Sequence, residues 1–260
     1  IVEAYCYPCR PLSYGAAISG YDHPRTKIIV TDEASKQRKI ESRKRSMRRT
    51  ASILRKLVNA NAWQYKTAAG VPYTPIFVTL TFKEDIRDIE KANTYFSNFI
   101  RRLNYNVSKG SKKCLLKYVA VIEFQDLNRD GVIHFHIVFF NLDPNEDKLF
   151  SEVWELGFVN IKRIGDIDNV GAYISKYISS ASVDARLDTH KRYFSSKGLL
   201  KPIEVMEEAK AQSIVSSIPR EYITKVSEFD GYQGRTRRIQ YNLNKDETLF
   251  DVIPDLNNLL

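Results

Sequence analysis

Two histidines stand two residues apart in the segment 131–140, and this spacing is the most specific sign of chemistry in the chain. The segment alternates as a β-strand does, with apolar residues on one face and His134 and His136 on the other. Two imidazoles about 7 Å apart along a strand face can bind one divalent ion. Two polar residues on a solvated sheet face are the alternative that this pattern leaves open.

An upstream segment supplies a carboxylate. Residues 118–124 form a second predicted strand, and the polar segment 125–131 is a turn that joins the two strands. In the antiparallel hairpin that results, Glu123 lies opposite His134 and on the same face as both histidines. A carboxylate with two neutral imidazoles and open positions suits Mg²⁺ or Mn²⁺, which can also hold a phosphate oxygen. We therefore predict that Glu123, His134 and His136 bind a divalent metal ion.

A predicted helix over residues 169–180 carries two tyrosines. Tyr173 and Tyr177 are one turn apart, and Lys176 lies on the same side of an apolar stripe. Their hydroxyl groups could take part in chemistry. Two half-buried tyrosines with exposed hydroxyls are an equally simple interpretation of this spacing.

The composition sets limits on the class of protein. With 260 residues, of which 43% are hydrophobic, the chain can form one domain with appendages or two small domains. No run of about 18 apolar residues occurs, so no membrane span is expected. The chain starts at Ile1, so a leader segment could precede it. Three cysteines do not make a disulfide framework, which favours a reducing cytoplasm, and the Cys6–Cys9 pair lacks the second pair of a zinc site.

The positive charge is concentrated in one segment. The whole chain has a net charge of +9, and residues 36–56 alone contain ten Lys or Arg and one Glu. Apolar residues recur at helical spacing there, which predicts an amphipathic basic helix over residues 36–58. A solvated basic face is the alternative, but so many like charges repel one another unless phosphates are present. The predicted DNA contacts of this helix are Arg38, Lys39, Arg43, Lys44, Arg45, Arg48 and Arg49.

A second basic segment, residues 192–199, mixes cations with aromatic residues. This composition suits stacking on bases or contact with a nucleic-acid backbone. Arg192 and Lys197 are its predicted DNA contacts.

The predicted elements follow the order β-α-β-β-α-β. This order is typical of an α+β, ferredoxin-like or RRM-like split βαβ fold, with a central antiparallel sheet and helices on one face. The other face is then free to carry Glu123 and the two histidines. The elements outside the hairpin are a strand at 76–82, a helix at 89–103 capped by Asp85 or Asp88, a helix starting at 143–146, a strand at 158–164, and a helix opened by Asp168. A further strand is possible at 26–30. The predicted domains are an N-terminal segment with the basic helix (1–70), the sheet domain (71–200) and a C-terminal extension (201–260).

Three motifs together resemble the HUH-endonuclease superfamily, specifically the rolling-circle replication initiators of bacteriophages and plasmids. The motifs are the segments 77–82, 134–136 and 173–177, and they occur in the order seen in that family. The resemblance covers about residues 36–200, and the joint occurrence is far more specific than any one motif.

The resemblance implies a metal-assisted transesterification on single-stranded origin DNA. Tyr173 would attack the scissile phosphate, leaving a 5′-phosphotyrosine and a free 3′-hydroxyl that primes a host polymerase. Tyr177 would attack when the replicated origin returns, and Lys176 would supply positive potential. Thr79 and Thr81 of the first motif are expected to contact DNA.

The implied partners are origin DNA, a host polymerase and a host helicase, in the cytoplasm of a bacterial host. A helicase partner is expected because the chain has no phosphate-binding loop of the ATPase type. Two alternatives remain open at this point. One is a non-catalytic nucleic-acid-binding module with an RRM-like sheet, and the other is a transposase or relaxase that uses the same nick.

Overall fold

The computed structural model describes residues 1–7, 32–110, 115–142, 147–167, 169–181, 185–187, 190–231, 234–243, 247 and 249–259. The chain forms two compact units. The central unit is Lys36–Pro202, and the terminal unit is Ile1–Ser35 together with Ile203–Leu260. The possible strand at 26–30, the helix start at 143–146 and Asp168 lie outside the described residues.

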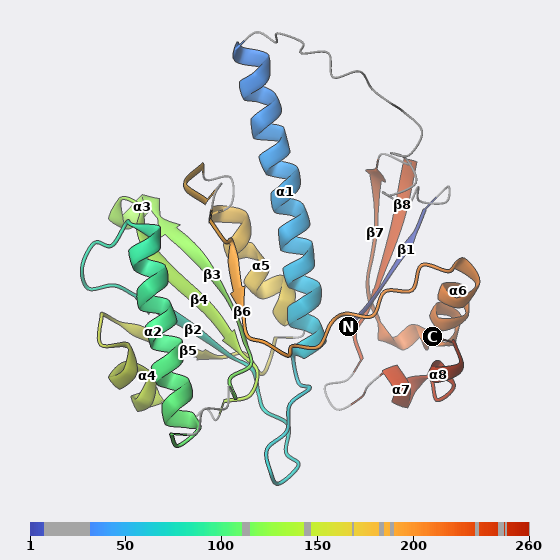
Figure 1. Cartoon of the computed structure of the whole chain (residues 1–260). Helices are drawn as coiled ribbons and strands as arrows, with labels where there is room; N and C mark the ends of the chain where they lie inside the picture. Colours follow the sequence, from blue (N-terminus) through green and yellow to red (C-terminus); the bar gives the residue numbers. More distant parts are fainter. Residues whose placement is uncertain are drawn as a thin grey trace. The chain divides into compact units, whose positions relative to one another are not determined.

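An antiparallel sheet of five strands forms the middle of the central unit, in the order β5-β2-β4-β3-β6 (Figure 1). Its strands are β2 (Ile76–Thr81), β3 (Tyr118–Gln125), β4 (Val132–Phe139), β5 (Val159–Arg163) and β6 (Tyr193–Ser195). The first four strands and the helices between them follow the predicted β-α-β-β-α-β order, so the α+β fold class is confirmed. The short strand β6 adds an edge beside β3 that the sequence did not indicate.

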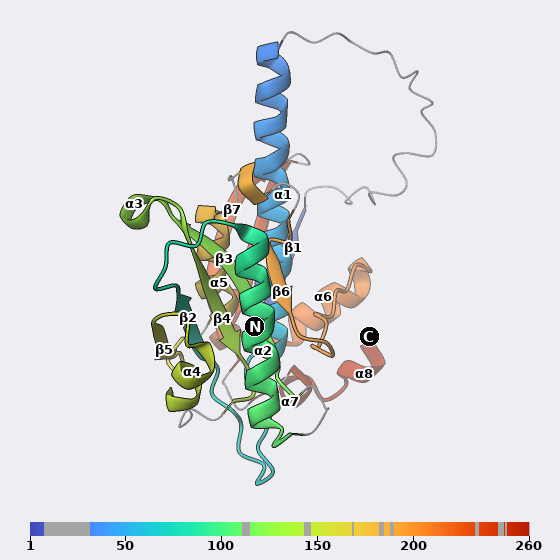
Figure 2. The same ribbon diagram turned by 60° about the vertical axis from the view of Figure 1, so that its left-hand side comes forward.

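One face of the sheet packs against α2 (Ile89–Val107) and α4 (Asp147–Trp154) (Figure 2). The side chains of Phe96, Phe99 and Trp154 are almost fully buried there. The predicted cap of α2 is Asp88, whose side chain accepts a hydrogen bond from the Lys91 amide at 2.8 Å. Aromatic burial of this kind provides most of the hydrophobic stabilisation on this face.

The other face of the sheet is covered as well, by α1 (Asp32–Asn61) and α5 (Val170–Ala181). The expectation that all helices lie on one face, with the other face free, was wrong. Alternate residues are apolar on both faces at one end of the sheet, so both faces need a cover. The buried residues of this second layer are Leu54, Val58, Ala62, Phe77, Val119, Val121, Val138, Phe140, Ile164, Val170 and Ile174.

The helix α1 has two parts with different surroundings. From Met47 onward, one side of the helix is buried, with Leu54 and Val58 fully covered. Residues 36–46 are exposed except Arg43, which is half-buried, and this part extends beyond the sheet (Figure 1). The basic helix predicted over 36–58 is therefore present and longer than expected. Ile40, predicted in the apolar stripe, is 36% exposed.

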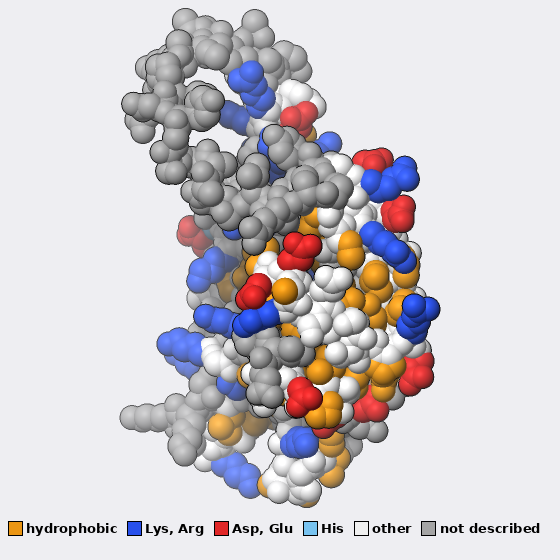
Figure 3. Space-filling view, turned by 90° about the vertical axis from the view of Figure 1, so that its right-hand side faces the viewer, with side chains coloured by type: hydrophobic (Ala, Val, Ile, Leu, Met, Phe, Trp, Pro, Cys, Tyr) orange, Lys and Arg blue, Asp and Glu red, His pale blue; other side chains and the backbone are white. Residues whose placement is uncertain are grey.

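The terminal unit contains a separate antiparallel sheet in the order β1-β8-β7. Its elements are β1 (Val2–Cys6), α6 (Glu208–Ser217), η2 (Arg220–Tyr222), β7 (Ile223–Gly231), β8 (Gly234–Tyr241), α7 (Leu249–Val252) and α8 (Leu256–Leu259). The sequence predicted no firm element near the N-terminus, because β1 pairs with a strand more than 230 residues away. On the face drawn in Figure 3, Lys and Arg side chains are interspersed with Asp and Glu.

None of the helices in the described part of the chain is long and apolar enough to cross a membrane.

Candidate active site

The hairpin of β3 and β4 brings a carboxylate to the histidines, as predicted. Glu123 is the direct register partner of His134, and His136 follows two residues along the same face of β4. The Oε2 atom of Glu123 lies 2.6 Å from Nε2 of His136. Both histidines are buried, each with 5% of its surface exposed.

A threonine of β2 holds His136 from its other side. Thr79 is the register partner of His136, and its hydroxyl oxygen lies 3.0 Å from Nδ1. A carboxylate can only accept, so Nε2 of the neutral ring carries the proton toward Glu123, and Nδ1 accepts from Thr79. A hydroxyl can also accept a hydrogen bond, so Thr79 can support the opposite tautomer, in which Nε2 is free to bind a metal.

His134 differs from its neighbour because its Nε2 atom is buried and has no hydrogen-bond partner among the described residues. Burial, the proximity of His136 and the positive charge of Arg129 lower the pKa of His134 to about 4, and the negative charge of Glu123 offsets this only in part. His134 is therefore neutral at pH 7. A neutral imidazole with a buried, unused lone pair suits a metal ligand.

The donor set fits a divalent ion, although no three His, Cys, Asp or Glu side chains of the described residues already stand in a metal-binding arrangement. Glu123 and His136 are in direct contact, and His134 is adjacent with its unpartnered nitrogen. An ion would separate the Glu123–His136 pair and give His134 its partner. One carboxylate and two imidazoles suit Mn²⁺, or Mg²⁺ with additional oxygen ligands.

Both predicted tyrosines of α5 lie over these strands. The ring centroid of Tyr177 is 4.1 Å from that of His136 and 5.3 Å from that of Phe77. Tyr173 meets Phe77 edge-on at 5.1 Å, and the two tyrosine rings are 6.1 Å apart. Phe77 also stacks on His136 at 5.5 Å. The helix and the strands therefore share one aromatic cluster beside the carboxylate.

The two tyrosines are not equivalent. Burial, the hydrogen bond with Tyr173, and the negative charges of an ionised Tyr173 and of Glu123 raise the pKa of Tyr177 to about 12. The Tyr177 hydroxyl therefore stays protonated at neutral pH. Tyr173 is the better placed of the two to receive positive charge, because two ammonium groups lie near its ring.

These two cations come from different elements. The Nζ atom of Lys176, one turn along α5, is 4.2 Å from the centroid of the Tyr173 ring. The Nζ atom of Lys162, on β5, is 5.4 Å from the same centroid. Both distances are within the range of a cation–π contact. Lys176 was expected from the sequence, whereas Lys162 was missed, since a lone lysine on a strand carries no signal.

The helix α1 fixes the start of the tyrosine helix. Asn59 accepts a hydrogen bond from the Gly171 amide at 2.8 Å and donates one to Asn169 at 3.1 Å. Asn169 in turn caps α5 by accepting from the Ala172 amide at 2.8 Å. A Cβ atom at Gly171 would lie 2.2 Å from the carbonyl oxygen of Arg55, so only glycine allows α5 to approach α1 this closely. The cap expected at Asp168 is thus made by Asn169 among the described residues.

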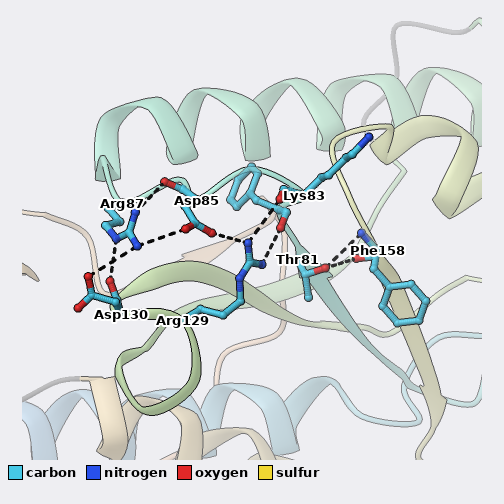
Figure 4. Close-up of polar contacts among 8 residues, drawn as sticks. Thr81, Lys83, Asp85, Arg87, Arg129, Asp130 and Phe158 are labelled. Carbon is cyan, nitrogen blue, oxygen red and sulfur yellow. Dashed lines mark hydrogen bonds and ion pairs between the residues drawn. The ribbon is translucent and has the colours of Figure 1, made fainter.

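The loops at one end of the sheet are joined by an ion-pair network (Figure 4). Arg129, in the short helix α3 (Asp126–Arg129) that replaces the predicted turn, donates to the Phe82 carbonyl at 2.8 Å and to Asp85 at 2.5 Å. Arg87 donates to the carbonyl of Asp130 at 2.7 Å. The hydrogen bond from Arg129 holds the pKa of Asp85 below its ordinary value. The network connects the β2–α2 loop to the β3–β4 connection that carries Glu123 and His134 at its base.

The threonines predicted to contact DNA are engaged within the protein. Thr79 contacts His136, and the hydroxyl of Thr81 donates to the Phe158 carbonyl at 3.0 Å and accepts from the Phe158 amide at 3.1 Å. Both side chains therefore hold elements of the site. A direct contact with DNA would have to come in addition to these bonds.

The cations predicted to contact DNA lie away from the tyrosines. Those on α1 are exposed, apart from the half-buried Arg43. Arg192 donates to the Ser46 hydroxyl of α1 at 3.4 Å, and Lys197 is exposed beyond β6. The residues that sequence reasoning missed are Phe77, as an aromatic contact, Lys162 and Asn59. Asn59 is a polar residue in a helix otherwise taken as a DNA-binding surface, so nothing in its neighbours indicated its role.

Residues 75–182 match the sequence model of a family of replication-associated proteins, the ORF2 family. This segment is less than half of the chain, but it contains β2 to α5 and therefore Glu123, both histidines and both tyrosines. The match supports a replication initiator protein. No curated protein and no solved structure matches the chain.

Proposed function

We propose that the protein initiates DNA replication by nicking single-stranded origin DNA through a tyrosine. The observation that carries the proposal is the contact of Tyr173 and Tyr177, on α5, with the strands that hold Glu123, His134 and His136. A nucleophile and a metal-binding donor set are thereby placed in one cluster. Each of the two alone has a simpler explanation, but their convergence from three separate segments does not.

In the proposed reaction, the Tyr173 oxygen forms a bond to phosphorus as the bond from phosphorus to the 3′ oxygen breaks. The phenolic proton passes to solvent, and the departing 3′ oxygen takes up a proton to become a free 3′-hydroxyl. The product is a 5′-phosphotyrosine, which conserves the phosphodiester energy, so the strand can be rejoined without ATP. The 3′-hydroxyl can prime a host polymerase, while a host helicase unwinds the duplex.

Positive charge beside Tyr173 assists this step. The ammonium groups of Lys176 and Lys162 lie within 4.2 Å and 5.4 Å of the ring centroid. They stabilise negative charge on the phenol oxygen and attract the phosphate to it. Glu123, His134 and His136 would hold Mg²⁺ or Mn²⁺, which when bound would polarise the scissile phosphate and stabilise charge on its oxygens.

Tyr177 is proposed to act second. Its raised pKa keeps its hydroxyl protonated while Tyr173 is uncommitted, because part of that rise comes from Tyr173 itself. Once the Tyr173 oxygen is esterified, it can no longer ionise, and that contribution disappears. Tyr177 then becomes the nucleophile that attacks when the copied origin returns.

The exposed basic part of α1 is proposed as the surface that holds DNA near the site. Its cations stand on an exposed stretch of helix with only one Glu between residues 36 and 49. Contacts from Lys and Arg to phosphates release counterions, so this binding is expected to weaken steeply as salt is raised.

The test uses end-labelled single-stranded oligonucleotides that tile the protein's own replicon, incubated with the protein and Mn²⁺, Mg²⁺ or EDTA. The expected result is a protease-sensitive, covalently shifted band that requires metal. Tyr173→Phe should abolish the first adduct, Tyr177→Phe should retain it, and Tyr105→Phe, an exposed tyrosine on α2, is the control. An adduct at the wild-type rate with Tyr173→Phe contradicts the assignment. Non-covalent binding alone under every metal favours the binding module with an RRM-like sheet.

A further inference from the structure

The edge strand β5 presents an exposed row of side chains beside the candidate active site. The row consists of Phe158, which immediately precedes β5, and Asn160 and Lys162 at alternate positions along it. All three are exposed, and 66% of the Phe158 surface is accessible. Among the described strands, β5 pairs only with β2, so no other described strand covers this edge of the sheet.

The row belongs to the face that carries the site. Lys162 is the register partner of Phe77, and its ammonium group reaches the Tyr173 ring. Asn160 is the register partner of Thr79, the residue that holds His136. A molecule that lies along this row therefore ends beside Tyr173.

The backbone of Phe158 is firmly held although its ring is exposed. Its amide and its carbonyl both bond the Thr81 hydroxyl. Trp154 donates to the Thr81 carbonyl at 2.8 Å, and a Cβ atom at Gly157 would lie 2.2 Å from that same oxygen. The tight turn at Gly157 therefore fixes the position from which the ring projects, and Figure 4 shows the ring pointing away from the ion-pair network.

The surroundings of the ring are open and partly cationic. A hollow of about 570 Å³ adjoins Phe158, and its lining includes Lys83 and Arg129. Such a volume is typical of a site for a small ligand or a single base. A fixed aromatic ring with cations at both ends of its row is the combination by which proteins hold single-stranded nucleic acid, through stacking on bases and contact with phosphates.

We propose that this β5 row, Phe158, Asn160 and Lys162, binds the single-stranded DNA that flanks the scissile phosphate. Phe158 stacks on a base, and Lys162 contacts a phosphate next to Tyr173. Four residues of strand separate the two, a distance of about 13 Å, so the stacked base belongs to a neighbouring nucleotide rather than to the one that is cleaved. The assignment rests on the proposed function for the position of the scissile phosphate.

The first experiment measures binding of fluorescein-labelled oligothymidylate by fluorescence anisotropy in EDTA, where no cleavage is expected. Phe158→Ala should weaken binding at least about fivefold, because one base stack is lost, and Phe158→Trp should restore it. Lys162→Gln should reduce the salt dependence of log Kd by about 0.7, the value for one phosphate contact with a single strand, whereas Phe158→Ala should leave it unchanged. The matched control is Tyr105→Ala, an aromatic residue of 64% exposure on the helix-covered side of the sheet.

A second experiment needs no variant. Oligothymidylate with single 5-iododeoxyuridine substitutions is irradiated with the wild-type protein, and the cross-linked peptide is identified by mass spectrometry. A cross-link at Phe158 supports the proposal. Unchanged affinity in Phe158→Ala, together with cross-links only at other residues, overturns it.

The outcomes separate this proposal from the proposed nicking function. If binding depends on Phe158 but no covalent adduct forms with any metal, the nicking chemistry is wrong and the stacking assignment stands. If the wild-type protein forms the adduct but neither binding nor cross-linking involves Phe158, the stacking assignment is wrong and the chemistry stands.

Discussion

Gly171→Ala provides a stringent test of how α5 is positioned, because two physical effects predict opposite signs. Glycine is a poor helix former, so alanine at this position of α5 should stabilise the helix by up to about 1 kcal/mol if space allowed. The structure leaves no such space. The new Cβ would lie 2.2 Å from the Arg55 carbonyl oxygen and 2.7 Å from Oδ1 of Asn59, where ordinary contacts start at 3.4 Å.

The magnitude follows from these distances. To restore a contact of 3.4 Å from 2.2 Å, the α5 and α1 backbones must separate by 1.2 Å. Overpacking of this kind costs about 1–3 kcal/mol, and the shift also weakens the hydrogen bond from the Gly171 amide to Asn59, worth about 1 kcal/mol. The net expectation is a loss of about 1–3 kcal/mol of unfolding free energy. Because Tyr173 moves with the helix, a displacement near 1 Å should also slow adduct formation by about 100-fold.

Urea unfolding followed by circular dichroism measures the first effect, and single-turnover adduct formation on a cleavable oligonucleotide measures the second. The control is Ala172→Gly, at the exposed neighbouring position, which should lose at most about 1 kcal/mol and keep its rate. A Gly171→Ala protein that is as stable as the wild type and reacts at the same rate would refute the argument that α1 sets the place of the tyrosine helix.

Three further outcomes are expected. Thr79→Val removes the hydroxyl that holds Nδ1 of His136, so Mn²⁺ should bind about 10–100-fold more weakly by isothermal titration, while the fold is retained; equal affinity would contradict the supporting role. In EDTA, the unfolded chain takes up a proton at His134 near pH 6.5 and the folded protein only near pH 4, so stability present above pH 6.5 is lost as the pH falls to about 4. The maximum loss is about 3 kcal/mol, and the difference between wild type and His134→Asn in urea midpoints at pH 7 and pH 4.5 should show it. Arg129→Ala removes the bonds to Asp85 and to two loop carbonyls and should cost about 1–2 kcal/mol, measured by the shift of the urea midpoint; a shift within error would show that the network is dispensable.

The sequence predicted the hairpin of the site well, for a physical reason. Strand residues alternate between faces, and the short connection fixes the register, so the sequence alone was enough to place Glu123 opposite His134. The helical spacing of Tyr173 and Tyr177 was equally reliable, since one turn puts both on one side of α5. Local periodicity is therefore sufficient to identify the chemical groups of the candidate site.

Contacts between distant segments were the part that could not be predicted. Asn59 and Gly171 are 112 residues apart, and neither has neighbours that indicate the other. The strand β1 pairs with β8 at the far end of the chain, and β6 is only three residues long. Periodicity within a segment carries no information about which segment will cover it, so the cover of the second sheet face by α1 and α5 was missed.

This missed layer determines the protonation states on which the proposed chemistry depends. On an open sheet face, His134 would be solvated, and its pKa would stay near 6.5. Under α1 and α5, burial lowers that pKa to about 4 and raises the pKa of Tyr177 to about 12. The motifs therefore provide the donor atoms, but packing decides that His134 is an available ligand at neutral pH and that Tyr177 holds its proton. Variants that loosen the α1–α5 contact should for this reason change the pH dependence of the reaction even when every residue of the three motifs is intact.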